Sequence, residues 1–343
     1  MARGIAVLSF ALLLSACGGN SPTAPSASNS LSNSQTPTAA PPAAPTATVT
    51  DPPRLACPNP ITLVSSSGGG GVVIYAAPSV QGGEGTVRVS CTPASGSSFP
   101  IGSTSVECKA TDALDRSASC VFPVTLFAPT RLSQTKFLAF GDSMTAGEIS
   151  SVTATASGLL MKQVVVPSAS YPAVLFQSLR ARYRSQFDDL YVFNDGQGAE
   201  WAQLALPRFV ESLRLDHPGV VLLMEGANDI CCNYGIDGVH AAERGIADMA
   251  GEARLRGARV FIGTLPPSKA GPRGNNAALI AAFNTDLRAV ATSAGAVLVD
   301  VYSTLLPDVE QNIGPDGLHP SEAGYRRIAD AFFAAIQQDL EIR

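Results

Sequence analysis

From residue 130 onward, the apolar residues fall into five continuous runs that do not alternate with polar ones. Such runs are typical of parallel strands that are covered on both faces. The predicted strands are residues 136–141, 190–194, 220–226, 259–265 and 296–302. The amphipathic stretches that follow them predict helices at 171–186, 204–217, 241–257, 276–295 and 321–340. This alternation of strand and helix predicts a three-layer α/β domain with a parallel sheet over residues 130–343.

A different pattern covers residues 54–128, where short runs rich in Val and Thr are bounded by Gly, Pro and Ser. The runs at 71–78, 85–91, 103–112 and 119–127 predict a small antiparallel β-sandwich. Four cysteines lie in this region, and in an exported protein an even group predicts two disulfides. They are Cys57, Cys91, Cys108 and Cys120. The spacing alone leaves their pairing open.

Residues 91–126, "CTPASGSSFPIGSTSVECKATDALDRSASCVFPVTL", resemble the second half of a hyalin repeat (HYR) domain, which has an immunoglobulin-like fold. With this resemblance, the preferred pairing is Cys91 with Cys108 and Cys57 with Cys120. The region has no histidine and its acidic residues are scattered, so we expect a spacer or adhesion module. Contact with a glycan or a protein is an expectation from the fold class alone.

The amino-terminal residues predict export. Residues 1–16 have a basic residue, Arg3, before an apolar stretch too short to span a bilayer, as in a secretory signal. "LSAC", residues 14–17, resembles the lipobox of bacterial lipoproteins, which implies lipidation of Cys17 and a membrane anchor. The alternative is an ordinary signal peptide with a chance cysteine. Residues 17–53 are nearly all small or polar and predict a disordered linker.

Charge excludes one class of partner. The chain has 343 residues, a charged fraction of 15% and a net charge of -5, and no stretch of it is strongly basic. The sequence has no basic segment that could neutralise a row of phosphates, so we expect no binding to nucleic acid.

Polar groups follow four of the predicted strands. The first strand ends in Gly141-Asp142-Ser143, the second in residues 194–200, and the third in residues 226–229. The fifth leads toward Asp316-Gly317-Leu318-His319-Pro320. Because the carboxyl ends of parallel strands meet at one edge of the sheet, these loops are expected to converge on one cleft.

A serine hydroxyl in this cleft needs a base to become a nucleophile. The chain has three histidines. His217 precedes the third strand, at the opposite edge of the sheet, and His240 lies in or beside the following helix. His319 alone falls on the same edge as Ser143. Asp316 precedes it by three residues and could accept a hydrogen bond from its Nδ1.

Ester chemistry also needs donors for the oxyanion. The candidates are the backbone N–H of Ser143, a backbone N–H at Gly198 and the side-chain amide of Asn228. The order of "GDSMT", the glycine, "GAND" and "DGLHP" resembles the SGNH (GDSL) hydrolases over about residues 136–338. The resemblance implies a flavodoxin-like sheet, esterase or lipase activity and no metal or organic cofactor.

The resemblance also assigns roles: nucleophile to Ser143, base to His319, the third triad position to Asp316, and oxyanion donors to Gly198 and Asn228. One block departs from the family pattern. The family glycine usually stands five residues after the asparagine that here is Asn194, and that position is Ala199. A backbone N–H from Ala199 could serve instead.

The same residues allow other interpretations. Asp142, Asp229, Asp300 and Asp316 with His319 could suggest a metal phosphoesterase, although that leaves Ser143 without a role. An inactive surface adhesin is a further alternative. For the substrate we expect short acyl esters such as acetyl groups on carbohydrate, with lipid or lysophospholipid esters as the alternative.

Two further segments border the predicted site. The neighbours Cys231 and Cys232 are either two thiols or a vicinal disulfide. Residues 148–170 are too apolar for a solvated loop, and we expect them to pack beside the cleft and shape the acyl site.

Overall fold

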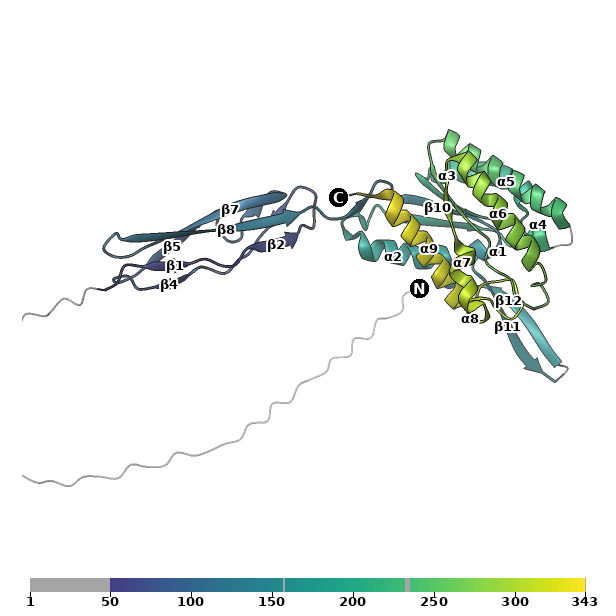
Figure 1. The fold of residues 1–343 in the computed structure, drawn as a ribbon, viewed down its shortest axis with the longest axis horizontal. Coiled ribbons are helices and arrows are strands. Elements are labelled where there is room, and N and C mark those ends of the chain that lie inside the picture. Colours follow the sequence, from purple (N-terminus) through teal and green to yellow (C-terminus); the bar gives the residue numbers. More distant parts are fainter. Residues whose placement is uncertain (1–49, 157, 232–234, 343) are drawn as a thin grey trace, which may run out of the picture. The chain divides into compact units, whose positions relative to one another are not determined.

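The computed structural model describes residues 50–156, 158–231 and 235–342 (Figure 1). The predicted signal peptide, Cys17 and most of the linker lie outside these residues, as does Cys232. Within the described ranges, no helix combines the length and hydropathy needed to cross a bilayer.

The amino-terminal region is all β, as predicted. A four-stranded sheet has the order β2 (Ile61–Val64), β8 (Ser117–Phe127), β7 (Gly102–Thr111), β5 (Arg88–Thr92). Two small sheets pair β1 (Arg54–Ala56) with β4 (Ser79–Gln81), and β3 (Gly71–Val72) with β6 (Ser98–Phe99). The expectation of a wholly antiparallel arrangement is wrong, because β2 runs parallel to β8. No hairpin turn joins these two strands, so nothing forces them to be antiparallel.

Two disulfides stabilise this β region. They join Cys57 to Cys120 and Cys91 to Cys108, which is the preferred pairing from the sequence. Cys91 and Cys108 lie opposite each other on β5 and β7. Alternate residues of β7, including Val106 and Cys108, are buried in the core of the region. Disulfides of this kind are typical of exported proteins.

The α/β region contains a parallel sheet of five strands, as predicted. The strands are β10 (Lys136–Gly141), β13 (Tyr191–Gly196), β14 (Val220–Met224), β15 (Arg259–Gly263) and β16 (Val297–Val299). Their order in the sheet is β13–β10–β14–β15–β16, and each neighbouring pair is parallel. The second strand along the chain thus lies outside the first, which is the flavodoxin-like order.

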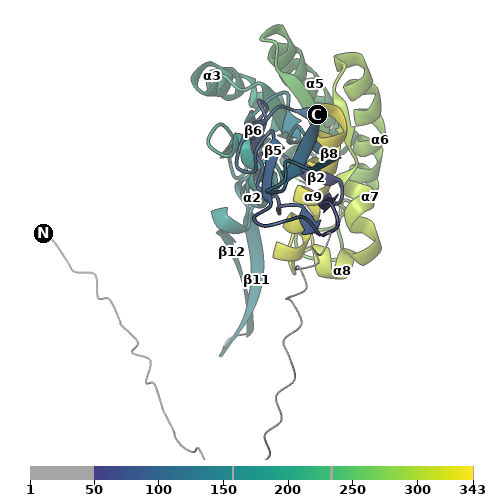
Figure 2. The same cartoon turned by 90° about the vertical axis from the view of Figure 1, so that its left-hand side faces the viewer.

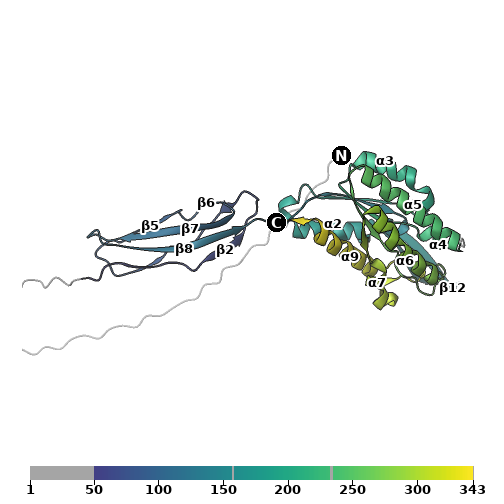
Figure 3. The ribbon, with the colours of Figure 1, turned by 45° about the horizontal axis from the view of Figure 1, so that its top comes forward.

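Helices cover both faces of this sheet. The long ones are α2 (Tyr171–Arg182), α3 (Leu206–Asp216), α5 (Gly235–Leu255), α6 (Ala277–Ala294) and α9 (Glu322–Leu340). Figures 1 and 3 show α2 and α9 on one side of the sheet and α3 and α5 on the other. Every residue of β14 is buried, which explains why its sequence is continuously apolar.

Short elements complete the domain. Four short helices, α1 (Ser143–Ala146), α4 (Ala227–Cys231), α7 (Val301–Leu305) and α8 (Val309–Asn312), lie in the connections. Strands β9 (Arg131–Leu132) and β17 (Glu341–Ile342) pair near the two ends of the domain. Strands β11 (Glu148–Thr155) and β12 (Gly158–Val165) pair as an antiparallel hairpin, which projects from the α/β body (Figure 2).

Candidate active site

The first sheet strand ends in glycine, aspartate and serine for local steric and polar reasons. A Cβ atom on Gly141 would lie 2.0 Å from the carbonyl oxygen of Met224, so no larger residue fits there. Asp142 caps α1 by accepting a hydrogen bond from the N–H of Met144, at 2.9 Å. Its other oxygen accepts from the N–H of Ala227, at 3.2 Å, which ties α1 to α4. Ser143 is therefore held as the first residue of α1.

Ser143, His319 and Asp316 form one connected chain of side chains. Ser143 Oγ and His319 Nε2 are 2.9 Å apart, and His319 Nδ1 and Asp316 Oδ2 are 2.5 Å apart. All three residues are buried. The second oxygen of Asp316 accepts from the N–H groups of Leu318 and His319, both at 3.1 Å. The short loop thus fixes the carboxylate relative to the imidazole, and Ser321 caps the helix that follows.

The charge state of Asp316 follows from these contacts. Burial alone would raise its pKa, but the hydrogen bond and charge of His319, with the N–H of Leu318, lower the pKa below its usual range. Asp316 is therefore ionised at neutral pH. An ionised acceptor at Nδ1 keeps the proton on that nitrogen and leaves Nε2 free to accept the serine proton.

The residues expected to bind the oxyanion lie in helix α4 and in the loop that follows β13. Asn228 lies in α4, and its side-chain amide donates one hydrogen bond to the carbonyl of Glu200 at 2.8 Å. An amide carries two N–H bonds, so a second donor remains. In the loop after β13, Ala199 has a φ of +60°, in the left-handed region that favours glycine. The φ of Gly198 is not in this region. This conformation supports Ala199 as the equivalent of the family glycine.

Arg208 of α3 holds this loop and was missed by the sequence analysis. Its guanidinium forms ion pairs with Glu200 and, at 2.7 Å, with Asp195. It also stacks over the ring of Phe140, with its Cζ atom 3.9 Å from the ring centroid. Acidic residues at 195 and 200 followed by an arginine in the next helix are a weak signal that could have suggested this arrangement.

Buried carboxyl groups surround the start of α1 and α4. Burial raises the pKa of Asp142 to about 6, against the lowering effect of its two backbone hydrogen bonds. Burial and the nearby Asp142 carboxyl raise the pKa of Glu225 well above its usual range. Burial also raises the pKa of Asp229, whose carboxylate accepts from the N–H of Ala202 at 2.8 Å. Each of these acids accepts a hydrogen bond from a backbone N–H, and burial makes each of them harder to ionise than an exposed carboxyl.

The β11–β12 hairpin reaches the triad, which the sequence analysis anticipated only as packing beside the cleft. Gln163 donates to Asp316 Oδ2 at 3.0 Å, and Ser150 Oγ accepts from the Asp316 N–H at 3.3 Å. Glu148 places a carboxylate oxygen 3.7 Å from His319 Nε2. The hairpin is thus part of the candidate active site.

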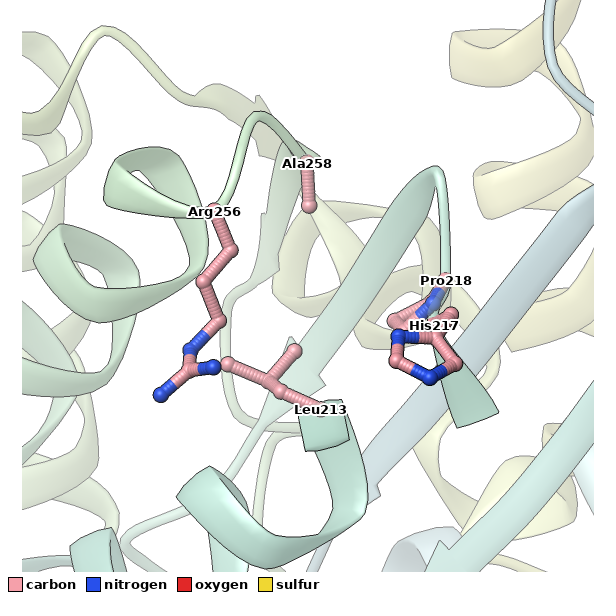
Figure 4. Close-up of a pocket in the computed structure, with 5 residues that line it drawn as sticks. All are labelled: Leu213, His217, Pro218, Arg256 and Ala258. Atoms are coloured by element: carbon pink, nitrogen blue, oxygen red, sulfur yellow. The ribbon is translucent and has the colours of Figure 1, made fainter. Parts of the chain in front are cut away.

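The two other histidines lie elsewhere. His217 follows α3 and precedes β14, at the amino edge of the sheet. There it lines a pocket with Leu213, Pro218, Arg256 and Ala258 (Figure 4). None of these five lining residues carries a hydroxyl or a carboxylate that could act with the imidazole. His240 lies within α5.

The acids of the metal alternative do not gather into one site. Asp300 caps α7, accepting from the N–H of Ser303 at 3.0 Å. Among the described residues, no group of three or more His, Cys, Asp or Glu side chains is placed to hold a metal ion. The vicinal cysteines stay a prediction, because Cys232 lies outside those residues. The Sγ of Cys231 is 3.8 Å from the carbonyl oxygen of Asn228.

Residues 139–327 match the family model described as the GDSL-like lipase/acylhydrolase family. The chain belongs to this family. Residues 49–126 match the HYR domain model. The GDSL residues that the sequence analysis singled out, from Ser143 to His319, all fall inside the first match.

Solved structures similar to this GDSL chain include hydrolases from several bacteria. A lipase/acylhydrolase from Enterococcus faecalis is 21% identical, with a TM-score of 0.49, over 60% of this chain and 97% of that chain. An acetylxylan esterase from Geobacillus stearothermophilus is 18% identical, with a TM-score of 0.47, over 60% and 95% of the two chains. A putative lipolytic protein from Desulfitobacterium hafniense is 20% identical, with a TM-score of 0.45, over 59% and 99%. The comparison with curated proteins gives no match.

Proposed function

We propose that this GDSL-family protein hydrolyses carboxylic esters through a triad in which Ser143 is the nucleophile, His319 the general base and Asp316 the residue that orients the base. The observation that carries the proposal is the connected chain Ser143 Oγ–His319 Nε2–Asp316, with distances of 2.9 and 2.5 Å. Nucleophile, base and orienting acid within hydrogen-bond reach are the signature of this chemistry.

The geometry supports a two-step reaction. His319 Nε2 accepts the proton of Ser143 as Oγ attacks the ester carbonyl, and the imidazolium then gives this proton to the departing alcohol oxygen. An acyl group remains bonded to Oγ. In the second step His319 takes a proton from a water molecule, whose oxygen attacks the acyl carbonyl. The imidazolium then returns a proton to Oγ as the acyl–Oγ bond breaks, which releases the carboxylic acid and Ser143. The ionised Asp316 stabilises the imidazolium that forms in each step.

The carbonyl oxygen becomes negatively charged in both steps and needs donors. We assign this role to the Ser143 N–H at the start of α1, the Asn228 side chain and a backbone N–H of the 198–199 turn. The N–H of Gln197 is used by the carbonyl of Gly141, and that of Glu200 by the carbonyl of Gln197. Because Ala199 carries the left-handed conformation, we favour its N–H over that of Gly198. Preorganised donors of this kind are each worth about 2.7–4 kcal/mol of transition-state stabilisation.

Both substrate classes expected from the sequence, short acyl esters on carbohydrate and lipid esters, contain the bond that this site would cleave. For location, we propose that lipidated Cys17 anchors the protein to a membrane and that the HYR-like region contacts a glycan or protein. The Cys17→Ala variant should leave the membrane fraction on cell fractionation. Unchanged partitioning would contradict the anchor, without bearing on the esterase proposal.

The test of the enzymatic proposal is hydrolysis of p-nitrophenyl esters, from acetate to palmitate, by the mature protein and by Ser143→Ala. We expect turnover that is lost in the variant. Equal hydrolysis by both proteins would contradict the role of Ser143. No hydrolysis of any ester by well-folded wild type would contradict general esterase activity and favour the adhesin alternative.

A further inference from the structure

The register of the β11–β12 hairpin shows which of its residues lie on the same face. Directly opposed residues of an antiparallel pair share a face, and the same face recurs every second residue. The opposed pairs include Ser150 with Gln163, Val152 with Met161, and Ala154 with Leu159. These three pairs therefore lie on one face, in order from the base of the hairpin outward.

The base of this face is fixed to the triad. Gln163 and Ser150 both hydrogen-bond to Asp316, through its carboxylate and its backbone N–H. Ser150 is buried. The face that continues outward from this pair therefore begins beside the reacting groups.

Beyond the polar base, the same face becomes apolar and open to solvent. Val152 is 42% exposed, Leu159 is 79% exposed, and Met161 is partly buried. We call Val152, Met161 and Leu159 the hairpin strip. Between residues 149 and 165 the sequence contains one charged residue, Lys162, which is on the opposite face with Ser151. A contiguous apolar strip beside a reactive centre is typical of a surface that binds an apolar group.

We propose that the hairpin strip binds the acyl chain of the ester substrate. This inference rests on the proposed esterase function and names its substrate class: esters whose acyl group is longer than acetyl. The face extends about 14 Å from Ser150 to Ala154, at ~3.4 Å per residue, and the hairpin strip forms its outer half. A chain of medium length that starts at the polar base is long enough to reach the strip. Each methylene that leaves water adds to binding, so the strip discriminates by chain length.

Leu159 and Leu160 provide a matched pair for the test. They are adjacent, chemically identical and both exposed, at 79% and 57%, but lie on opposite faces, since Leu160 is opposed to Thr153. In wild type we expect kcat/KM to rise about tenfold from p-nitrophenyl acetate to the octanoate. Leu159→Ser should lower kcat/KM for the octanoate about fivefold and change kcat/KM for the acetate less than twofold. Leu160→Ser should change neither ester by more than twofold.

Three results would overturn the proposal. The first is a wild-type profile that falls from acetate to octanoate, and the second is an equal effect of the two leucine variants on the octanoate. The third is a loss of binding to phosphatidylcholine vesicles by both variants with unchanged ester profiles, which would assign the hairpin to a membrane surface. The Ser143→Ala variant distinguishes failure of the esterase proposal from failure of the strip proposal. Ester hydrolysis that survives in this variant contradicts the esterase proposal. Hydrolysis that depends on Ser143 but has the same kcat/KM for acetate and octanoate contradicts only the role of the strip. Thermal unfolding of each variant confirms that it is folded.

Discussion

The Nδ1 atom of His319 lies 2.5 Å from Oδ2 of Asp316, and both side chains are fully buried. The three-residue spacing lets one short loop supply both groups, while its own N–H groups hold the other carboxylate oxygen. The imidazole is thus aimed at Ser143 before any substrate binds.

Asp316→Asn should lower kcat about 10⁴-fold, because the amide presents no ionised acceptor to stabilise the imidazolium and favours the wrong tautomer of His319. The measurement is steady-state hydrolysis of a p-nitrophenyl ester. The exposed Asp188→Asn is the control and should match wild type. An Asp316→Asn variant that is folded and retains more than about a tenth of the activity would contradict the role of Asp316.

Asn228→Ala should lower kcat by about 10²–10³-fold and change KM little, since an oxyanion donor acts mainly in the transition state. The kcat and KM values from a full saturation curve check this. Because Asn228 also donates to the carbonyl of Glu200, thermal unfolding must show that the loop is retained. A folded variant with raised KM and unchanged kcat would assign Asn228 to substrate binding instead.

Asp142 should make the folded protein less stable as the pH rises from about 4 to 6. Burial raises its pKa to about 6, whereas a carboxyl in the unfolded chain titrates near 4. The folded state therefore binds the proton more tightly, and the free energy of unfolding falls across this window. Asp142→Asn should reduce that fall by on the order of 2 kcal/mol.

Urea denaturation at pH 4.5 and pH 7 measures this difference for wild type and Asp142→Asn. Asp188→Asn, at an exposed position, is the control substitution. If the free energy of unfolding falls equally in wild type and Asp142→Asn, the pKa of Asp142 is not raised in the folded protein.

The two disulfides should contribute unequally to the stability of the β region. Cys57–Cys120 spans 63 residues and Cys91–Cys108 spans 17. In the chain-entropy model, losing the longer loop costs about 1 kcal/mol more. Calorimetry of Cys57→Ser/Cys120→Ser and Cys91→Ser/Cys108→Ser should show this order, with ester hydrolysis retained in both. The reverse order would show that native contacts outweigh loop entropy here.

The fold of the α/β domain was predictable because its central strands, β10, β14 and β15, are buried on both faces. Short continuous runs such as residues 136–141 and 220–224 indicate buried strands, and the stretches of helical length between them indicate that the strands are parallel. The β region was less predictable. Of the expected run 71–78, only Gly71–Val72 forms a strand, since Val and Thr content does not by itself determine which residues pair.

The parts of the candidate site that follow the carboxyl ends of parallel strands were predictable, because these ends meet at one edge of the sheet. They include Ser143, Asn228 and His319. The contacts of Arg208 and Gln163 were not, because each depends on a side chain reaching a distant loop. The hairpin was missed for a related reason. Its exposed faces give no consistent alternation of apolar and polar residues, which is the usual sequence signal for a strand.

Covalent labelling of Ser143 tests the central claim most directly. Incubation of the mature protein with diethyl p-nitrophenyl phosphate should add one diethylphosphoryl group, located by peptide mass spectrometry on Ser143, with loss of activity in parallel. His319→Ala should label far more slowly, since Oγ then lacks its base. Labelling of another residue, or equal labelling of wild type and His319→Ala, would contradict the account.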